Sequence, residues 1–285
     1  MVLYRDHHAW CPYCQKVWLF LEEMQIPYRV NKVTMFCYGQ KENWFIKHVN
    51  SRGMLPAVTI DGTVVTDSDN VIAQLERAFG TLRDKPFQST AVAGHRKLER
   101  VLFGAWCDWL CRQNSSRQES SAKLNYQQAL RKLERDLEAC GGPFFFGNDL
   151  SIADIVFIPM LERQIASVYY YKSYDVRAEH PIIASFFDAL EALDSYRGTK
   201  SDFHTHVHDL PPQMGACFFG DGKSLAMRTD YTDRVDNGPF MSTPEVNESS
   251  WPLDKVLYSK AAVYRVLRHW DKLVTVNPYA AQESG

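Results

Sequence analysis

The feature that most constrains this chain is the motif Cys11-Pro12-Tyr13-Cys14, which follows a short apolar strand and opens a helix. Apolar residues recur at helical spacing directly after the motif, from residue 15 to residue 24. Cys11 then falls at the N-cap, where unpaired backbone amides and the helix dipole stabilise a thiolate. Pro12 suits the first helical position because its missing N–H costs nothing there. The motif predicts a strand–helix unit that carries thiol chemistry.

The two cysteines of this motif take different expected roles. Cys11 is the expected nucleophile, and Cys14, one helical turn further on, can resolve a mixed disulfide. The alternative is half of a zinc site, but this needs a second pair of ligands and the chain has no other Cys-x-x-Cys. The seven cysteines are odd in number and irregularly spaced, unlike a secreted disulfide framework. We therefore expect redox or thiol catalysis in a reducing compartment.

The pattern along the 285 residues predicts two domains and an extension. Residues 1–80 have the order β-α-β-α-β-β-α, and residues 80–90 form a polar linker. Helical patterns follow at 91–113, 122–140 and 181–193, with a Ser-rich break at 114–121. Ser151 and Asp154 form a capping box that begins a further core helix. Residues 196–250 show little periodicity, and a final helix is expected at about 253–273.

The extension, residues 196–285, holds many large apolar side chains that need a surface to pack on. We expect it to pack on the helical domain rather than to fold alone. The net charge of −2 argues against nucleic acid as a partner, which would require a basic face. No apolar run approaches the roughly 18–20 residues that cross a bilayer. We expect neither nucleic acid nor membrane among the partners.

Two further pairs of residues fall where elements of the first domain begin. Leu55-Pro56 starts the third strand and suits a cis bond that faces the cysteine, although an ordinary edge-strand proline is the alternative. Asp67-Ser68 ends a strand and opens a helix, so amides and a hydroxyl can converge there on an anion. The alternative for this second pair is a plain helix cap.

Together these motifs resemble the glutathione transferase superfamily. The resemblance rests on the Cys-Pro-Tyr-Cys motif, Leu55-Pro56, Asp67-Ser68 and the capping box around residues 150–154, in order and at these spacings. It implies an N-terminal thioredoxin-like α/β domain at 1–80 and an all-helical C-terminal domain at 91–195. The cysteine is typical of the thiol-dependent classes: omega, lambda and dehydroascorbate reductases. The extension, through residues 196–209, resembles the iota class of photosynthetic organisms.

The resemblance implies glutathione as co-substrate and indicates which residues would bind it. The backbone of Leu55 would pair with the cysteinyl part, and Asp67 and Ser68 would hold the γ-glutamyl end. Lys41 would meet the glycyl carboxylate, although a solvated lysine at a helix end is an equal alternative. Tyr13 and Pro56 complete the expected glutathione site.

Other candidates lie outside these motifs. Aromatic residues of the helical domain could line an apolar acceptor pocket, although at helical spacing they are more often core; these are Phe103, Trp106, Tyr169 and Tyr170. His204, His206 and His208 alternate, so a strand would point all three to one face. No carboxylate or thiol is fixed nearby by the sequence, so we expect a folded tail and no metal site.

The expected function is glutathione-dependent thiol transfer, in which Cys11 forms a mixed disulfide with glutathione that glutathione or Cys14 then releases. The alternatives are conjugation of glutathione to electrophiles and a non-catalytic ligand-binding protein on the same fold. The expected partners are glutathione and a small apolar or glutathionylated acceptor, with a possible homodimer. The expected location is the cytoplasm or the plastid stroma.

Overall fold

A computed structural model describes residues 1–220 and 225–237. The first domain has the expected order of elements, with a single short 3₁₀ turn added between the second strand and the second helix. Its elements are β1 (Val2–Asp6), α1 (Pro12–Glu23), β2 (Arg29–Val33), η1 (Phe36–Tyr38), α2 (Asn43–His48), β3 (Ala57–Ile60), β4 (Thr63–Thr66) and α3 (Ser68–Phe79).

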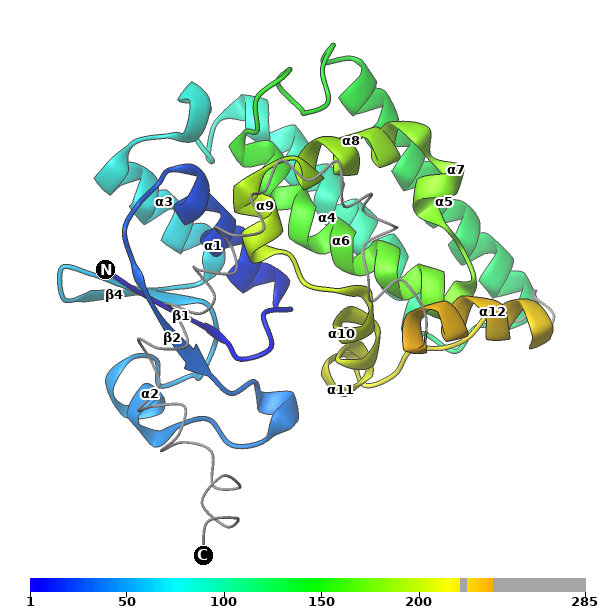
Figure 1. Cartoon of the computed structure of the whole chain (residues 1–285), viewed down its shortest axis with the longest axis horizontal. Coiled ribbons are helices and arrows are strands. Elements are labelled where there is room, and N and C mark those ends of the chain that lie inside the picture. Colours follow the sequence, from blue (N-terminus) through cyan, green and yellow to red (C-terminus); the bar gives the residue numbers. More distant parts are fainter. Residues whose placement is uncertain (221–224, 238–285) are drawn as a thin grey trace, which may run out of the picture. The chain divides into compact units, whose positions relative to one another are not determined.

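The four strands form one mixed sheet in the order β2-β1-β3-β4. β1 runs parallel to β2 and antiparallel to β3, and β3 pairs antiparallel with β4. Successive side chains of a strand point to opposite faces. Leu3 and Val58 therefore join the main core with α1 and α3, whereas Tyr4 and Ala57 join Phe45 of α2 in a smaller cluster. The sheet is thus covered on both faces, by α1 and α3 on one side and by α2 on the other (Figure 1).

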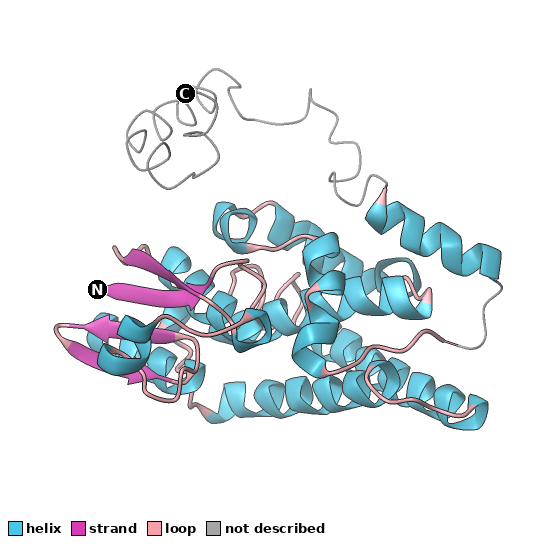
Figure 2. Cartoon of the chain, turned by 90° about the horizontal axis from the view of Figure 1, so that it is seen from below, coloured by secondary structure: helices cyan, strands magenta, loops and turns pink. Residues whose placement is uncertain are grey.

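The second domain is a helical bundle built around one buried helix. Its elements are η2 (Leu82–Asp84), α4 (Thr90–Leu110), α5 (Ser116–Glu138), α6 (Ile152–Lys172), α7 (Val176–Glu179) and α8 (Pro181–Glu191). All residues of α6 are buried, because α1, α4 and later helices pack around it. Figure 2 shows the sheet and the long helices as separate regions of the chain. The thioredoxin-like domain and the helical domain expected from the sequence are both confirmed.

The capping box predicted at the start of α6 is present. The Oδ2 atom of Asp154 accepts from the backbone amide and the hydroxyl of Ser151, at 2.8 and 2.5 Å. Its Oδ1 atom accepts from the amide of Phe145 at 2.9 Å, so the cap also fixes the preceding loop. One carboxylate thus satisfies two buried amides, which would otherwise be costly.

One prediction for the helices was wrong. The Ser-rich stretch at 114–121 was expected to be a break, but α5 begins at Ser116 because Ser115 and Gln118 form a second capping box. Residues 196–250 show little periodicity, yet four short helices fall wholly or partly in their described part. These are α9 (Asp194–Thr199), α10 (Phe203–His208), α11 (Leu210–Met214) and α12 (Leu225–Asp236).

The described part of the extension contacts both domains. α9 packs on α1, and α10 and α12 pack on α6. The helix expected at about 253–273 lies outside the described residues. The expected boundaries, and the packing of the whole extension on the helical domain, stay predictions. Across residues 1–220 and 225–237, every helix is too short or too polar to span a membrane.

Candidate active site

The two motif cysteines lie where the sequence predicts them. Cys11 is the N-cap of α1, with extended φ and ψ angles of −64° and 114°. Both side chains are nearly inaccessible, at 2% exposed for Cys11 and 1% for Cys14. Burial, and then the neighbouring Cys11 thiol, raise the pKa of Cys14 well above its usual value. Cys14 therefore remains a thiol at neutral pH, which suits a group that acts in the second step of an exchange.

A buried carboxylate, that of Asp6, lies close to the two cysteines. The Oδ2 atom of Asp6, at the end of β1, accepts from the backbone amides of Trp10 at 2.9 Å and Cys11 at 3.3 Å. Its Oδ1 atom has no hydrogen-bond partner among the described residues. Ligand atoms of Asp6, Cys11 and Cys14 all lie within 4.8 Å of one another. Asp6 thus holds the loop before the motif and adds negative charge that further raises the pKa of Cys14.

Asp6 was missed by the sequence analysis. Its signal is a charged residue that directly follows a buried strand and precedes the motif, but a single sequence cannot distinguish it from an ordinary loop residue. For the zinc alternative, the cluster supplies three ligand atoms, and no further His, Cys, Asp or Glu of the described residues joins it.

The residues expected near the glycyl and cysteinyl parts of glutathione lie on the sheet side of the site. The Leu55–Pro56 peptide bond is cis, as expected. The Nζ atom of Lys41 donates to the backbone carbonyl of Thr34 and lies 4.8 Å from the ring centre of Phe36. Burial lowers the pKa of Lys41, while the nearby cysteines act in the opposite direction. Lys41 is therefore within electrostatic reach of the cysteines, but its ammonium already has a partner.

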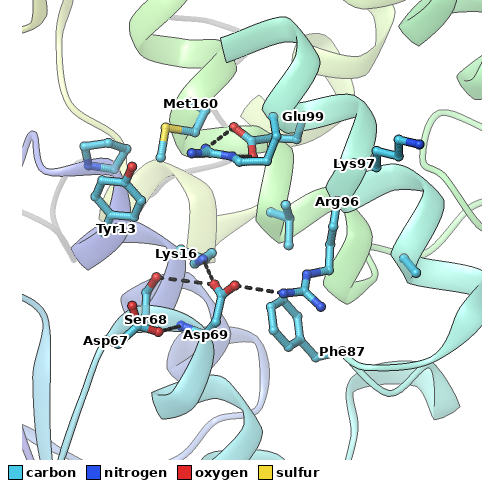
Figure 3. A pocket seen from close by; sticks show the side chains of 14 residues that line it. Tyr13, Lys16, Asp67, Ser68, Asp69, Phe87, Arg96, Lys97, Glu99 and Met160 are labelled. Atoms are coloured by element: carbon cyan, nitrogen blue, oxygen red, sulfur yellow. Dashed lines mark hydrogen bonds and ion pairs between the residues drawn. The ribbon is translucent and has the colours of Figure 1, made fainter. Parts of the chain in front are cut away.

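A cavity of about 350 Å³ opens between α1, the start of α3 and α4 (Figure 3). It falls at the small end of the range for ligand pockets, roughly 300–1,000 Å³. Three residues expected to bind glutathione line it together: Tyr13, Asp67 and Ser68. The wall contributed by α4 was not predicted and includes Arg96 and Arg100.

Asp67 holds the start of α3 in an unusual conformation. Its φ angle is 71°, in a region that non-glycine residues rarely adopt. Its Oδ1 atom accepts from the amides of Asp69 at 3.0 Å and Asn70 at 3.2 Å. The carboxylate is thus fixed at the mouth of the cavity, beside the hydroxyl of Ser68.

Asp69 is the charged centre of this cavity. It is paired with Lys16 of α1, and its Oδ2 atom lies 2.9 Å from a guanidinium nitrogen of Arg96. Burial raises the pKa of Asp69, but the two cations outweigh burial and the net pKa is lowered. Figure 3 shows Lys16, Asp69 and Arg96 aligned across the cavity. The cavity therefore offers charges of both signs, as a zwitterionic ligand end requires.

The expected acceptor-pocket residues are placed differently. Trp106 is fully buried and donates to the hydroxyl of Ser167 at 2.9 Å. The ring of Phe103 lies 5.4 Å from that of Trp106, and Tyr169 packs 4.5 Å from Tyr231 of α12. None of these residues lines the cavity described above, and neither does Tyr170. Their role in an acceptor pocket stays a prediction.

Side chains of the extension reach the loop before the cysteines. Asp209 accepts from the hydroxyl of Tyr38 in η1 and lies 3.4 Å from Nδ1 of His8. Arg163 of α6 bonds to Gln213 of α11, and its guanidinium lies 4.9 Å from the ring of Trp10. The extension thus contacts η1, α6 and the loop that precedes the motif.

Comparisons with known proteins identify the class of this chain. The model of the glutathione S-transferase N-terminal domain matches residues 10–78, and that of the C-terminal domain matches residues 117–189. The chain belongs to the glutathione S-transferase superfamily.

One relative and two solved structures illustrate the similarity of this chain to the superfamily. Glutathione S-transferase DHAR2 of Arabidopsis thaliana is 27% identical over 191 residues, 67% of this chain and 84% of the relative. The glutathione transferase Omega 3C of Trametes versicolor shares 25% identity with a TM-score of 0.60, over 70% of this chain and 89% of its own. The dehydroascorbate reductase of Chlamydomonas reinhardtii has the same fold, with 19% identity, a TM-score of 0.61 and coverage of 73% and 95%. The narrower resemblance to the iota class stays a prediction.

Proposed function

We propose that this chain is a glutathione-dependent thiol transferase whose nucleophile is Cys11. The observation that carries the proposal is the cysteine pair at the start of α1, with Cys11 at the N-cap and Cys14 inside the helix as a buried thiol. The cis Leu55–Pro56 bond and the cavity at the start of α3 supply the two sides of a glutathione site. Membership of the superfamily supports the same activity.

The proposed reaction removes glutathione from a mixed disulfide. The Cys11 thiolate attacks the glutathione sulfur, a new S–S bond forms, and the acceptor thiolate leaves and takes up a proton. The thiolate of a second glutathione then attacks the glutathione sulfur bound to Cys11, which yields glutathione disulfide and restores the Cys11 thiolate. In the alternative second step Cys14 loses its proton, attacks Cys11 and expels glutathione. The resulting Cys11–Cys14 disulfide is reduced by two glutathione molecules.

Charge complementarity supports the proposed position of the γ-glutamyl end. Its carboxylate would accept from the Ser68 hydroxyl and face Lys16 and Arg96, and its ammonium would face Asp67 and Asp69. Tyr13 would lie beside the peptide backbone of glutathione. The backbone of Leu55 would pair with the cysteinyl part, with Pro56 fixing its direction, and Lys41 would approach the glycyl carboxylate.

The names of the relatives suggest an acceptor. Dehydroascorbate is a small carbonyl compound, and its reduction to ascorbate by two glutathione molecules, with release of glutathione disulfide, would use the same cysteine and the same cavity. We propose to assay dehydroascorbate as a substrate in parallel with glutathionylated peptides. The relatives include cytosolic and chloroplastic proteins, so the cytoplasm and the plastid stroma are both proposed locations. A homodimer is proposed as the assembly.

Cysteine variants test the proposal. Cys11→Ser should abolish deglutathionylation, whereas Cys14→Ser should retain much of it because free glutathione releases the intermediate. Cys140→Ser, just beyond the distant end of α5, is the matched control and should be unaffected. Intact thiol transfer in Cys11→Ser would overturn the mechanism. A gain of conjugation in that variant would favour the transferase alternative, and an inert Cys11 in the wild type would favour a ligand carrier.

A further inference from the structure

The histidine run of the extension forms a helix and not a strand. Residues 203–208 make up α10, whose N-cap Asp202 accepts from the amide of Thr205 at 2.7 Å. His204 and His208 therefore lie four residues apart on one face. His206 turns to the other side, where it is buried and its Nε2 atom lies 2.8 Å from Glu162. The sequence-based expectation that all three histidines share one face assumed a strand, whereas the helix brings only His204 and His208 to one face.

A carboxylate completes this face of α10. Asp236, the last residue of α12, places its Oδ1 atom 2.7 Å from Nε2 of His208. The ring centres of His204 and His208 are 4.4 Å apart. Ligand atoms of all three residues lie within 4.8 Å of one another. Two imidazoles and one carboxylate thus converge from two helices that are distant in the sequence.

A neighbouring tyrosine orients this carboxylate. The hydroxyl of Tyr170 in α6 donates to Oδ2 of Asp236 at 3.0 Å, and its ring lies edge-on to His208. Tyr170 is itself only 8% exposed, so its position is fixed by packing. Oδ1 is thereby left to face the imidazoles, which is how outer hydrogen bonds orient metal ligands. The side chains of His208 and Asp236 are 41% and 34% exposed, so an ion can reach them from solvent.

We propose that His204, His208 and Asp236 bind a divalent transition-metal ion, with Zn²⁺ as its representative. Imidazole and carboxylate are zinc ligands, whereas Ca²⁺ and Mg²⁺ prefer oxygen ligands throughout. Bond lengths of about 2.0–2.2 Å place the ligand atoms of a tetrahedral zinc site about 3.4 Å apart. Small side-chain rotations would widen the His208–Asp236 separation of 2.7 Å and adjust the other separations, all within 4.8 Å, to that value. Water fills the fourth position, and the ion ties α12 to α10.

Zinc titration of the full-length chain tests the site. The Cys11→Ser/Cys14→Ser variant serves as background, because it removes the thiol pair from competition. Calorimetry should detect a site in this background that His204→Ala, His208→Ala and Asp236→Asn each weaken at least tenfold. His48→Ala, which removes an exposed histidine of α2, is the matched control and should leave the affinity unchanged. Tyr170→Phe should weaken binding about tenfold through the carboxylate.

Cobalt spectroscopy identifies the ligands. Co²⁺ in the same background should give a ligand-field spectrum without a thiolate charge-transfer band, and this spectrum should be lost in His208→Gln. A zinc-dependent rise in Tm that disappears in the three ligand variants supports the site. Equal affinity in the background and the ligand variants, equal weakening by His48→Ala, or a thiolate band would each overturn the proposal. Circular dichroism verifies that each variant is folded.

Discussion

Glu162 joins three parts of the chain through one buried carboxylate. Its Oε2 atom accepts from the side-chain amide of Gln15 in α1 at 3.1 Å. Its Oε1 atom accepts from the backbone amide of Ser201 at 2.9 Å and lies 2.8 Å from Nε2 of His206. The helix that carries the cysteines is thus tied to α6 and to the extension at a single residue.

Replacement by alanine should be severely destabilising. Glu162→Ala removes the acceptor from the buried side chains of Gln15 and His206 and from the half-buried amide of Ser201, each at a cost of about 1–3 kcal/mol. These costs are not additive, and we take the loss of this hydrogen-bond network together as about 3–5 kcal/mol. We expect the free energy of unfolding to fall by that amount, a large part of the roughly 5–15 kcal/mol that stabilises a typical domain.

Replacement by glutamine is the matched comparison. In Glu162→Gln, the new side chain would keep one acceptor oxygen for Ser201 and His206. Its amide group would face Gln15, whose own oxygen has no partner among the described residues. A flip of the Gln15 amide turns that oxygen toward the new donor, so the bonds are conserved and only the charge is lost. We expect a cost of about 1–2 kcal/mol.

Urea unfolding followed by circular dichroism measures both costs, and limited proteolysis monitors residues 200–202, which the carboxylate anchors. Glu162→Ala should become sensitive to cleavage there, and Glu162→Gln should remain resistant. A cost below about 1 kcal/mol for alanine, or equal costs for the two variants, would refute the reasoning.

Three further outcomes are expected. Burial raises the pKa of Asp154 to about 6, so the folded chain holds this proton more tightly than the unfolded chain. The stability that this proton contributes, measured relative to Asp154→Asn, is thus fully present below about pH 4 and falls by about 3 kcal/mol as the pH rises through 6. Urea unfolding of both proteins at the two ends of this pH range checks this, and a wild-type advantage that grows with pH would contradict it. Ser68→Ala should raise the KM for glutathione about tenfold with kcat unchanged, and a loss in kcat alone would argue against ground-state binding. Asp6→Asn should lower the pKa of Cys14 in a Cys11→Ser background, measured by alkylation rate against pH, and an unchanged profile would exclude the charge effect.

Local signals in the sequence predict most of the first domain. The cysteine motif, the turn between β3 and β4 and the alternation of strand residues each act over a few neighbours, so they are visible in a single chain. The start of α5 was also visible, because Ser115 and Gln118 have capping-box spacing, but the serines around them suggested a loop. The short helices of the extension were not visible. Each has too few turns for a periodic pattern, and buried residues such as Val207 and Leu210 stabilise them by tertiary packing.

The residues of the candidate site also divide into those that the sequence predicts and those that depend on how distant helices pack. Asp67 and Ser68 were predicted because they stand at a helix start, where amides and a hydroxyl can converge on an anion, and Tyr13 was predicted from the family resemblance. Arg96 and Asp69 were not, since their pairing depends on how α4 packs beside α3. For the aromatic residues of α6 the sequence cannot decide between pocket and core, because a fully buried helix offers no polar face that would separate lining residues from core.

The contacts of Asp209 and Gln213 lie outside the part of the chain that the two domain models match. Both residues lie beyond residue 189, where the match to the C-terminal domain model ends, and they contact Tyr38 and Arg163 near the loop that precedes Cys11. The surroundings of the motif are therefore built from two stretches of sequence, one covered by the domain models and one beyond them. We expect substitutions in the α10–α11 segment to change the surroundings of Cys11 while the motif itself stays unaltered.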